Sequence, residues 1–590
     1  MNTPTPTANT VPLRRADFET LTEALDYAAL GVTGANFHAG GKLVTALPYR
    51  VLRDQAVTLA RRLAGLRLAR GSRLAIVAET SPDFLRFFFA CQYAALVPVA
   101  LPATVNLGGH AAYVQKLRGM LRACDASAAM ASDAFLGFLG EAVAGMDLLV
   151  WGTPATFDAL PECGDALPAT GPLDTAYLQF TSGSTGTPKA AVITQRALLA
   201  NASGSASAGL QVRDDDRVAS WLPFYHDMGL VGCLLSVMTT QRSVDYLDTR
   251  EFAMRPRRWL ELISRMRATV TYSPPFGYEI CAHRLRASDI ASYDFSRWRV
   301  AGIGAEMIDP EVPRRFAELL RPAGFDARAF VASYGMAEDA LAISFAALGR
   351  GIVVDHTVDT TAWFPAIDDA GGDRGFVRCG TPLPEHEIKV CDDAGNPLAD
   401  RHIGRICVRG PSVMSGYFRQ PEATARVLSP DGWLDTGDLG YLVDGEIVVT
   451  GRHKDMIIIN GRNIWPQDME RIAERQPGLR LQDASAFSIP GPGGGEIAVI
   501  EVQCHLVGAE EREALARHIR QEIYEALGIA CQVELVPRHT LPRTSSGKLS
   551  RSATRSDYLK RHAQPHVHAQ RSATSHTAPI GERYALEPER

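Results

Sequence analysis

The residue types best suited to chemistry lie in one glycine- and hydroxyl-rich loop between Thr181 and Lys189. Apolar residues 176–180 and 190–193 flank the loop and indicate a strand on each side. Glycines allow backbone amides to approach an anion, hydroxyls donate hydrogen bonds, and a lysine adds positive charge. The pattern predicts a polyphosphate-binding loop formed by Thr181, Ser182, Gly183, Ser184, Thr185, Gly186, Thr187 and Lys189.

Two other kinds of loop share some of these residue types. A Walker A loop needs Gly-Lys-Ser/Thr leading into a helix, whereas Lys189 leads into an apolar strand, so a P-loop kinase or GTPase is disfavoured. An ordinary glycine- and serine-rich surface loop is the second interpretation. Few surface loops combine two glycines, five hydroxyl residues and a terminal lysine, so phosphate binding is favoured.

The loop and four later motifs stand in the order found in the acyl-adenylate-forming enzymes, which the chain resembles from about residue 18 to about residue 556. That superfamily contains acyl-CoA synthetases, luciferases and the adenylation domains of peptide synthetases. The later motifs are Tyr334-Gly-Met-Ala-Glu338, Thr436-Gly-Asp438, Gly451-Arg-His-Lys-Asp455 and Pro542-Arg-Thr-Ser-Ser-Gly-Lys548.

The resemblance implies that the chain uses ATP and magnesium to activate a carboxylic acid. The acid oxygen must attack the α-phosphate, so the enzyme has to neutralise two anions that repel each other. By similarity, Glu338 binds magnesium as a hard oxygen ligand and Lys189 contacts the triphosphate. The remaining nucleotide contacts that the resemblance implies are Gly304, Ala305, Glu306, Tyr334, Gly335 and Met336 for adenine, and Asp438 and Arg452 for the ribose.

Three further residues carry roles by the same resemblance. Lys548 would enter the active site to bridge the carboxylate and the α-phosphate, Lys454 would be the hinge between two domain orientations, and His226 would border the acyl site. Taken singly, the carboxylates could be helix caps or turn residues, and Lys548 a solvated lysine. As an ordered set, these residues favour an active site.

Residues 221–232 most resemble the fatty acyl-AMP ligases, which load acyl chains onto carrier proteins of polyketide and peptide synthetases. Residues 101–113, 273–278 and 460–468 agree with this branch, and Phe276 and Tyr278 become candidate substrate contacts. An amino-acid substrate is disfavoured, because His226-Asp227 stands where amino-acid adenylation domains commonly carry Phe-Asp. The expected partners are a fatty acid and an acyl carrier protein. A fatty acyl-CoA synthetase and a non-catalytic scaffold are the alternatives.

The connection between Glu338 and Gly380 spans 42 positions, which is long for this place in the family. In acyl-AMP ligases an insertion here restrains the domain motion that CoA thioesterification needs. A tolerated surface loop is the alternative, since the entropy of loop closure grows slowly with length.

Composition limits the class of protein. The chain has 590 residues, 46% of them apolar and 22% charged, with a formal charge of −5, so nucleic acid is not an expected partner. Ten scattered cysteines favour reduced thiols in a cytoplasmic protein. Pro98 interrupts the most apolar stretch, residues 87–101, so no transmembrane segment is expected.

A helical pattern over Leu52 to Leu66 is followed by the strand-like residues 73–77, and Asp444-Gly445 indicates a hairpin turn. Such alternation of helical and strand-like segments predicts an α/β fold. We expect a large N-terminal domain of parallel-type sheets flanked by helices plus a β subdomain, with a small mobile α+β C-terminal domain. The expected divisions are a disordered segment 1–14, an adenylating domain 15–453, a C-terminal domain 454–555 and a disordered tail 556–590. Four histidines between 562 and 576 could bind a metal, but a disordered tract is favoured.

Overall fold

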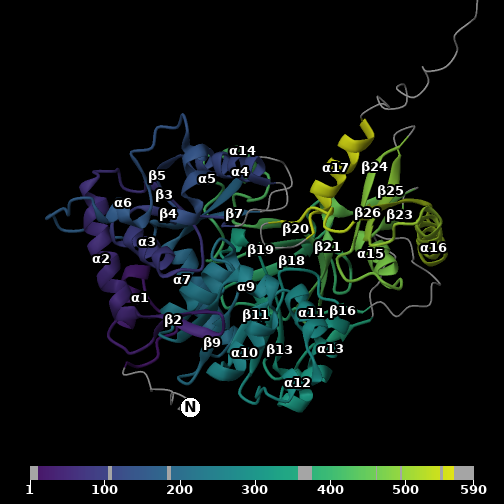
Figure 1. Cartoon of the computed structure of the whole chain (residues 1–590), viewed down its shortest axis with the longest axis horizontal. Coiled ribbons are helices and arrows are strands. Elements are labelled where there is room, and N and C mark those ends of the chain that lie inside the picture. The colour runs from purple at the N-terminus through teal and green to yellow at the C-terminus, as the bar shows by residue number, and fades with distance from the viewer. Residues whose placement is uncertain are drawn as a thin grey trace, which may run out of the picture.

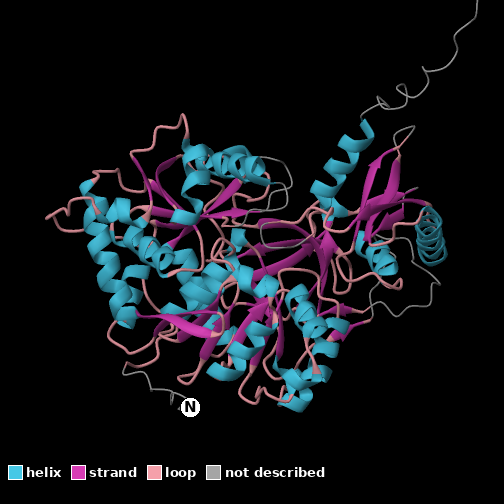
Figure 2. Ribbon diagram, in the orientation of Figure 1, coloured by secondary structure: helices cyan, strands magenta, loops and turns pink. Residues whose placement is uncertain are grey.

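The computed structural model describes residues 11–103, 109–181, 188–356, 375–459, 462–491, 495–544 and 549–563. Two large sheets, a smaller antiparallel sheet and a separate C-terminal unit make up these residues (Figure 1). Figure 2 shows helices around the sheets of the large N-terminal part. The expected α/β fold class, with a large N-terminal and a small C-terminal domain, is confirmed.

The first sheet carries the phosphate-loop strands at one edge. Its order is β6 (Val150–Gly152), β5 (Ala126–Met130), β3 (Arg73–Val77), β4 (Val97–Leu101), β7 (Thr175–Thr181) and β8 (Lys189–Thr194). All neighbours are parallel except β7 and β8. Its helices are α2 (Tyr49–Gly65), α3 (Pro82–Tyr93), α4 (Gly109–Ala123), α5 (Asp133–Val143), α6 (Pro154–Asp158) and α7 (Gln195–Gly204). Ser81 caps α3 by accepting from the Phe84 amide at 3.3 Å, and Pro82 fits its first turn.

The second sheet has parallel central strands and antiparallel edges. Its order is β17 (Thr381–Pro382), β14 (Ala342–Phe345), β13 (Phe330–Gly335), β12 (Val300–Ile303), β11 (Val270–Ser273), β9 (Arg217–Ser220), β10 (Ser243–Leu247), β1 (Gly34–Ala39) and β2 (Lys42–Pro48). Its helices are α1 (Leu21–Ala28), α8 (Ser236–Thr239), α9 (Thr249–Met254), α10 (Arg257–Met266), α11 (Pro275–Arg284), α12 (Ala287–Ile290) and α13 (Glu311–Leu320), with π-helices η1 (Ser205–Gly209) and η2 (Met228–Leu235) and 3₁₀ turns η3 (Arg321–Ala323), η4 (Ala327–Ala329) and η5 (Ala337–Asp339). A continuous apolar core joins the two large sheets.

The β subdomain is an antiparallel sheet of β18 (Glu387–Cys391), β19 (Gly404–Arg409), β20 (Leu434–Val443) and β21 (Glu446–Arg452), with α14 (Pro421–Ala425) nearby in the chain. Asp444-Gly445, which the sequence marks as a hairpin turn, joins β20 to β21, and both residues have positive φ (52° and 77°) as such turns require. A short ladder of β15 (Val354–Asp355) and β16 (Phe376–Val377) lies beside it.

The C-terminal unit has its own apolar core. Its strands are β22 (Ile457–Ile459), β23 (Arg462–Ile464), β24 (Ala484–Pro490), β25 (Glu496–Cys504) and β26 (Cys531–Pro537), and its helices are α15 (Pro466–Glu474), α16 (Ala509–Leu527) and α17 (Arg551–Ala563). The turn η6 (His453–Asp455) connects it to β21.

Residues 11–14 and 556–563 belong to the segments expected to be disordered, but the structure describes them. Helix α17 continues past residue 555, because Tyr558 packs edge-on against Phe487 at 5.5 Å and donates to the Gln532 side chain at 2.8 Å. At the other end, the Arg14 amide donates to the Gln241 side chain at 2.8 Å, so ordered contacts begin inside the expected segment 1–14. The other histidines of the C-terminal tract, beyond His562, lie outside the described residues.

Two expectations from composition concern the whole chain. All ten cysteines fall in the described ranges and are unpaired, and all but Cys163 are buried. Among the residues that the structure describes, no helix has both the length and the apolar character of a membrane span.

The stability of the C-terminal domain should depend on pH through Glu501. Burial raises the pKa of Glu501 to about 7, although the Arg561 guanidinium acts to lower it. In the unfolded chain the pKa should be about 4.3, so the folded state binds the proton more tightly and stability falls as pH rises from about 4 to about 7. We expect Glu501→Gln to flatten this loss when thermal unfolding is followed between pH 5 and 8. If the thermal midpoints of the two proteins change with pH in the same way, the pH dependence does not come from Glu501.

Candidate active site

The strands on either side of the phosphate loop meet where the sequence predicts. Thr181 ends β7 and lies opposite Lys189, the first residue of β8. The predicted phosphate contacts Ser182, Gly183, Ser184, Thr185, Gly186 and Thr187 lie outside the described residues. The loop therefore begins and ends at adjacent positions on the sheet edge.

A tyrosine that the motifs do not contain connects Lys189 to Glu338. The Lys189 Nζ atom lies 4.9 Å from the centre of the Tyr417 ring, and the Tyr417 hydroxyl donates to Glu338 Oε1 at 2.8 Å. Residues 415–418 pair with β8: the Phe418 amide donates to the Ala190 carbonyl at 2.8 Å, and Tyr417 bridges Ala191. This pairing places the β subdomain connection next to the phosphate loop.

Glu338 is a buried carboxylate, 9% exposed, in η5. Burial raises the pKa of Glu338 and the Asp227 carboxylate acts in the same direction, whereas the Tyr417 hydrogen bond and the Arg452 charge lower it. Within the described ranges no three His, Cys, Asp or Glu side chains cluster as a metal site. A single buried carboxylate such as Glu338 suits magnesium, because magnesium is usually bound by one or two protein carboxylates together with substrate phosphates rather than by protein side chains alone.

Tyr334, Asp438 and Arg452 come together although they are far apart in the sequence. The Tyr334 hydroxyl donates to Asp438 Oδ2 at 2.8 Å, and Arg452 Nε lies 3.2 Å from Asp438 Oδ1. Asp438 and Arg452 are directly paired across β20 and β21. Burial raises the pKa of Asp438, and the Arg452 charge and the Tyr334 hydrogen bond act against this. The cluster presents polar atoms that suit a ribose.

The predicted adenine segments follow two neighbouring parallel strands. Gly304 follows β12, and Tyr334 and Gly335 end β13, so both segments lie at the same edge of the sheet. A Cβ atom at Gly304 would lie 2.4 Å from the Ser333 carbonyl oxygen, and one at Gly335 would lie 1.9 Å from the Leu341 carbonyl oxygen. Only glycine permits these approaches. Ala305 has φ 65° and Glu306 and Met336 continue the two segments.

His226 lies half-buried just before η2, with its Nδ1 atom 2.6 Å from Asp227 Oδ1. Phe276, near the start of α11, packs edge-on against Trp221 with ring centres 5.8 Å apart. Tyr278 differs from the expectation of a substrate contact, because its side chain is fully buried and its hydroxyl donates to the Gly302 carbonyl at 2.9 Å. Its ring packs in the core against the rings of Trp259, Phe316 and Phe330.

The C-terminal domain faces the same region. Lys548 lies outside the described residues, but Arg543 and Leu549 on either side of its segment form a β-bridge. Burial lowers the pKa of Arg543, and the carboxylates of Asp483 and Glu306 act against this. Arg471 of α15 is 3.6 Å from Asp309 of the large domain. Lys454 lies in η6, between the two domains.

Sequence reasoning missed Tyr417 and the buried acid Asp339. Tyr417 belongs to no charged or glycine-rich motif, and its contact with Glu338 depends on tertiary pairing alone. Burial raises the pKa of Asp339 well above its ordinary value, and its carboxylate oxygens have no hydrogen bond among the described residues. The His386 Nε2 atom is 4.0 Å from Asp339 Oδ2, but burial lowers the pKa of this histidine and so disfavours its charged form. For Asp339, its place next to Glu338 in the sequence was the one indication that it lies near the site.

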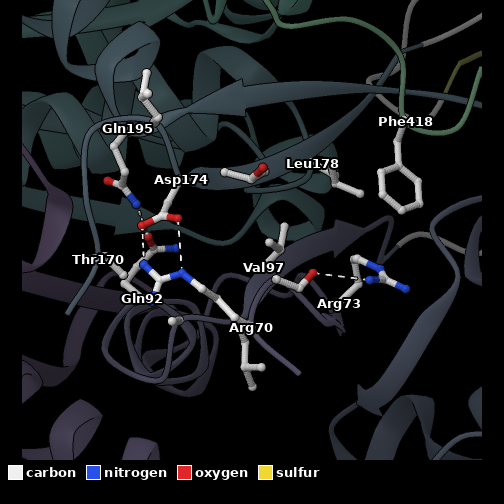
Figure 3. Close-up of a pocket in the computed structure, with 14 residues that line it drawn as sticks. Arg70, Arg73, Gln92, Val97, Thr170, Asp174, Leu178, Gln195 and Phe418 are labelled. Carbon is white, nitrogen blue, oxygen red and sulfur yellow. Dashed lines mark hydrogen bonds and ion pairs between the residues drawn. The ribbon is translucent and has the colours of Figure 1, made fainter. Parts of the chain in front are cut away.

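A separate cavity of about 270 Å³ lies at the amino ends of β4 and β7, the end opposite the phosphate loop. Its side chains are drawn in Figure 3, where Arg70 contacts Asp174 and Gln195 contacts Gln92. Four of the polar side chains that line this cavity are therefore paired with one another.

The phosphate-loop edge, the buried Glu338 and the Tyr334–Asp438–Arg452 cluster define a nucleotide-binding α/β protein of the adenylate-forming class. The chain belongs to the AMP-binding enzyme family, whose model matches residues 35–418. It is 47% identical over 563 residues to a Caulobacter vibrioides protein with the provisional name acyl-CoA synthetase, covering 94% of this chain and 98% of that one.

Two further relatives support the comparison. A solved structure from a study of the fatty acyl-adenylate ligases of E. coli and L. pneumophila matches with a TM-score of 0.88 and 45% identity, covering 94% of this chain and all of the other. The medium-chain-fatty-acid acyl-carrier-protein ligase JamA of Moorena producens is 29% identical over 582 residues, covering 93% of this chain and 96% of JamA. The expected membership of the adenylate-forming superfamily is confirmed.

Proposed function

We propose that this chain is a fatty acyl-AMP ligase. It joins a fatty acid to the α-phosphate of ATP, releases pyrophosphate, and transfers the acyl group from acyl-AMP to an acyl carrier protein of a polyketide or peptide synthetase. The observation that carries the proposal is the contact chain from Lys189 through Tyr417 to Glu338, which gathers a cation and a metal-binding carboxylate at the end of the phosphate loop.

Each residue has a role that follows from its position. Lys189 neutralises phosphate charge, and the hydrogen bond from the Tyr417 hydroxyl favours the ionised form of Glu338 against the effect of burial. Glu338 would bind magnesium, which supplies positive charge to the phosphates during displacement. Asp438 accepts from the ribose hydroxyls, and Lys548 adds charge where the carboxylate meets the α-phosphate.

The connection between Glu338 and Gly380 supports a carrier protein rather than CoA as acceptor. Its described ends are anchored: Asp355 accepts from Arg401 at 2.9 Å and from the Tyr441 hydroxyl at 2.9 Å. Phe376 belongs to an apolar cluster that also contains Trp465 of the C-terminal domain. A connection tied to both domains opposes rotation of one against the other.

The acceptor can be tested with ATP, magnesium and a fatty acid, with and without CoA. Suppose that the connection raises the free energy of the CoA-accepting orientation by about 3 kcal/mol. The population of that orientation then decreases more than about a hundredfold, so acyl-AMP should accumulate without acyl-CoA. Shortening the chain between residues 357 and 372, which keeps β15 and β16, should let some acyl-CoA appear.

Two outcomes would change the assignment. If the full-length protein converts CoA as fast as it forms adenylate, it is an acyl-CoA synthetase, the activity named for the Caulobacter relative. If no fatty acid supports pyrophosphate release by folded protein, the chain is a scaffold. Equal transfer by the shortened and full-length proteins would exclude the connection as the determinant.

A further inference from the structure

Arg551, the first residue of α17, contacts two carboxylates on different elements. Its Nε and Nη2 atoms donate to Glu470 Oε1 and Oε2 at 2.7 and 2.6 Å, and its Nη1 atom donates to Asp455 Oδ2 at 3.1 Å. Glu470 lies on α15 and is 9% exposed, and Oε1 also accepts from the Ala486 amide at 3.0 Å. Burial acts to lower the pKa of Arg551, but the two carboxylates raise it.

Asp455 is the last residue of η6 and immediately follows the proposed hinge residue Lys454. Arg551 therefore fixes the C-terminal side of the hinge to the body of the C-terminal domain. On the other side, Arg452 is held to the large domain by its ion pair with Asp438 at 3.2 Å. His453 and Lys454 are the residues left between these two attachments.

Arg551 also follows Lys548 by three positions, so the same guanidinium holds the chain that leaves the Lys548 segment. We propose that Arg551 is a positioning residue for adenylate formation, which ties the hinge, α15 and the chain after Lys548 into one rigid unit. This inference rests on the proposed function. A bidentate guanidinium–carboxylate contact fixes direction as well as distance, which a lysine at this position could not do.

Because catalysis by a positioned charge depends on sub-ångström placement, loss of the unit should affect kcat more than substrate binding. For Arg551→Gln we expect kcat for fatty-acid-dependent ATP–pyrophosphate exchange to fall about 30- to 100-fold, with KM for ATP and fatty acid changed less than about threefold. Arg551→Lys, which keeps charge but not the fork geometry, should lose about tenfold. Asp455→Asn, which leaves the Glu470 contact, is a milder second variant and should also lower kcat.

Arg561 provides a matched control on the same helix. It also contacts two carboxylates, Glu501 and Glu534, but neither belongs to the hinge. Arg561→Gln should lower the thermal midpoint and leave kcat within about threefold of wild type. Hydrogen exchange adds a readout that needs no activity: residues 453–456 and 549–556 should exchange faster together in Arg551→Gln but not in Arg561→Gln.

The outcomes separate this inference from the proposed function. A folded wild-type protein without fatty-acid-dependent exchange would overturn the proposed function itself. An active wild type whose Arg551→Gln variant keeps kcat, or keeps slow exchange at residues 453–456, would overturn the positioning role. An equal loss of kcat in Arg561→Gln would also overturn it, because the effect would then follow domain stability.

Discussion

Glu338→Gln is expected to raise the magnesium concentration needed for half-maximal adenylate formation and to lower the maximal rate. Glutamine keeps the shape and can still accept from the Tyr417 hydroxyl, but it removes the negative charge that a hard cation prefers. Loss of an outer partner of a metal ligand typically costs 10- to 100-fold, so losing the ligand's charge should cost about 100-fold or more. The measurement is a magnesium titration of the initial rate.

Tyr417→Phe is the control for this prediction. It removes the hydrogen bond to Glu338 and leaves the carboxylate, so its magnesium requirement should rise less, by about tenfold. If the magnesium profile of Glu338→Gln matches that of wild type, another carboxylate holds the metal.

Lys548→Ala is expected to abolish adenylate formation while leaving the fold and ATP affinity nearly unchanged. A cation that acts mainly in the transition state lowers the barrier without tightening substrate binding. Removing one such stabilising group typically costs about 100- to 1000-fold in kcat. Acyl-AMP production in single turnovers, ATP affinity by calorimetry and thermal unfolding would check the three parts. Near wild-type acyl-AMP production would remove Lys548 from the mechanism.

The sequence was most informative where structure is local. Strand 73–77 was predicted with the bounds of β3, and the turn at Asp444-Gly445 joins β20 to β21 as expected. The helix expected from Leu52 to Leu66 is α2, Tyr49–Gly65. Turn chemistry and hydrophobic periodicity act over a few residues, so they determine these elements without the rest of the chain.

For residues far apart in the sequence, we could predict that they belong to one site but not which of them contact each other. Tyr334 and Asp438 were both assigned to the nucleotide, yet their hydrogen bond spans 104 positions and depends on how β13 meets β20. Tyr417 was not predicted to belong to the site, because an aromatic residue outside any charged or glycine-rich motif has no local sequence pattern that indicates function. Tyr278 was assigned to substrate because it shares a motif with Phe276, but its hydroxyl is used by the Gly302 carbonyl.

The pairing of residues 415–418 with β8 also bears on when the nucleotide site is completed during synthesis of the chain. The Gln420 side chain donates to the Pro188 carbonyl across 232 positions, so this edge closes only after residues 415–420 have left the ribosome. Contacts of such separation form late, because chain entropy opposes them until the intervening parts have folded. A nascent chain that ends before Ser415 carries Lys189 and Glu338 but not the tyrosine between them. Nucleotide binding should therefore arise abruptly in translation, after most of the large domain has already folded.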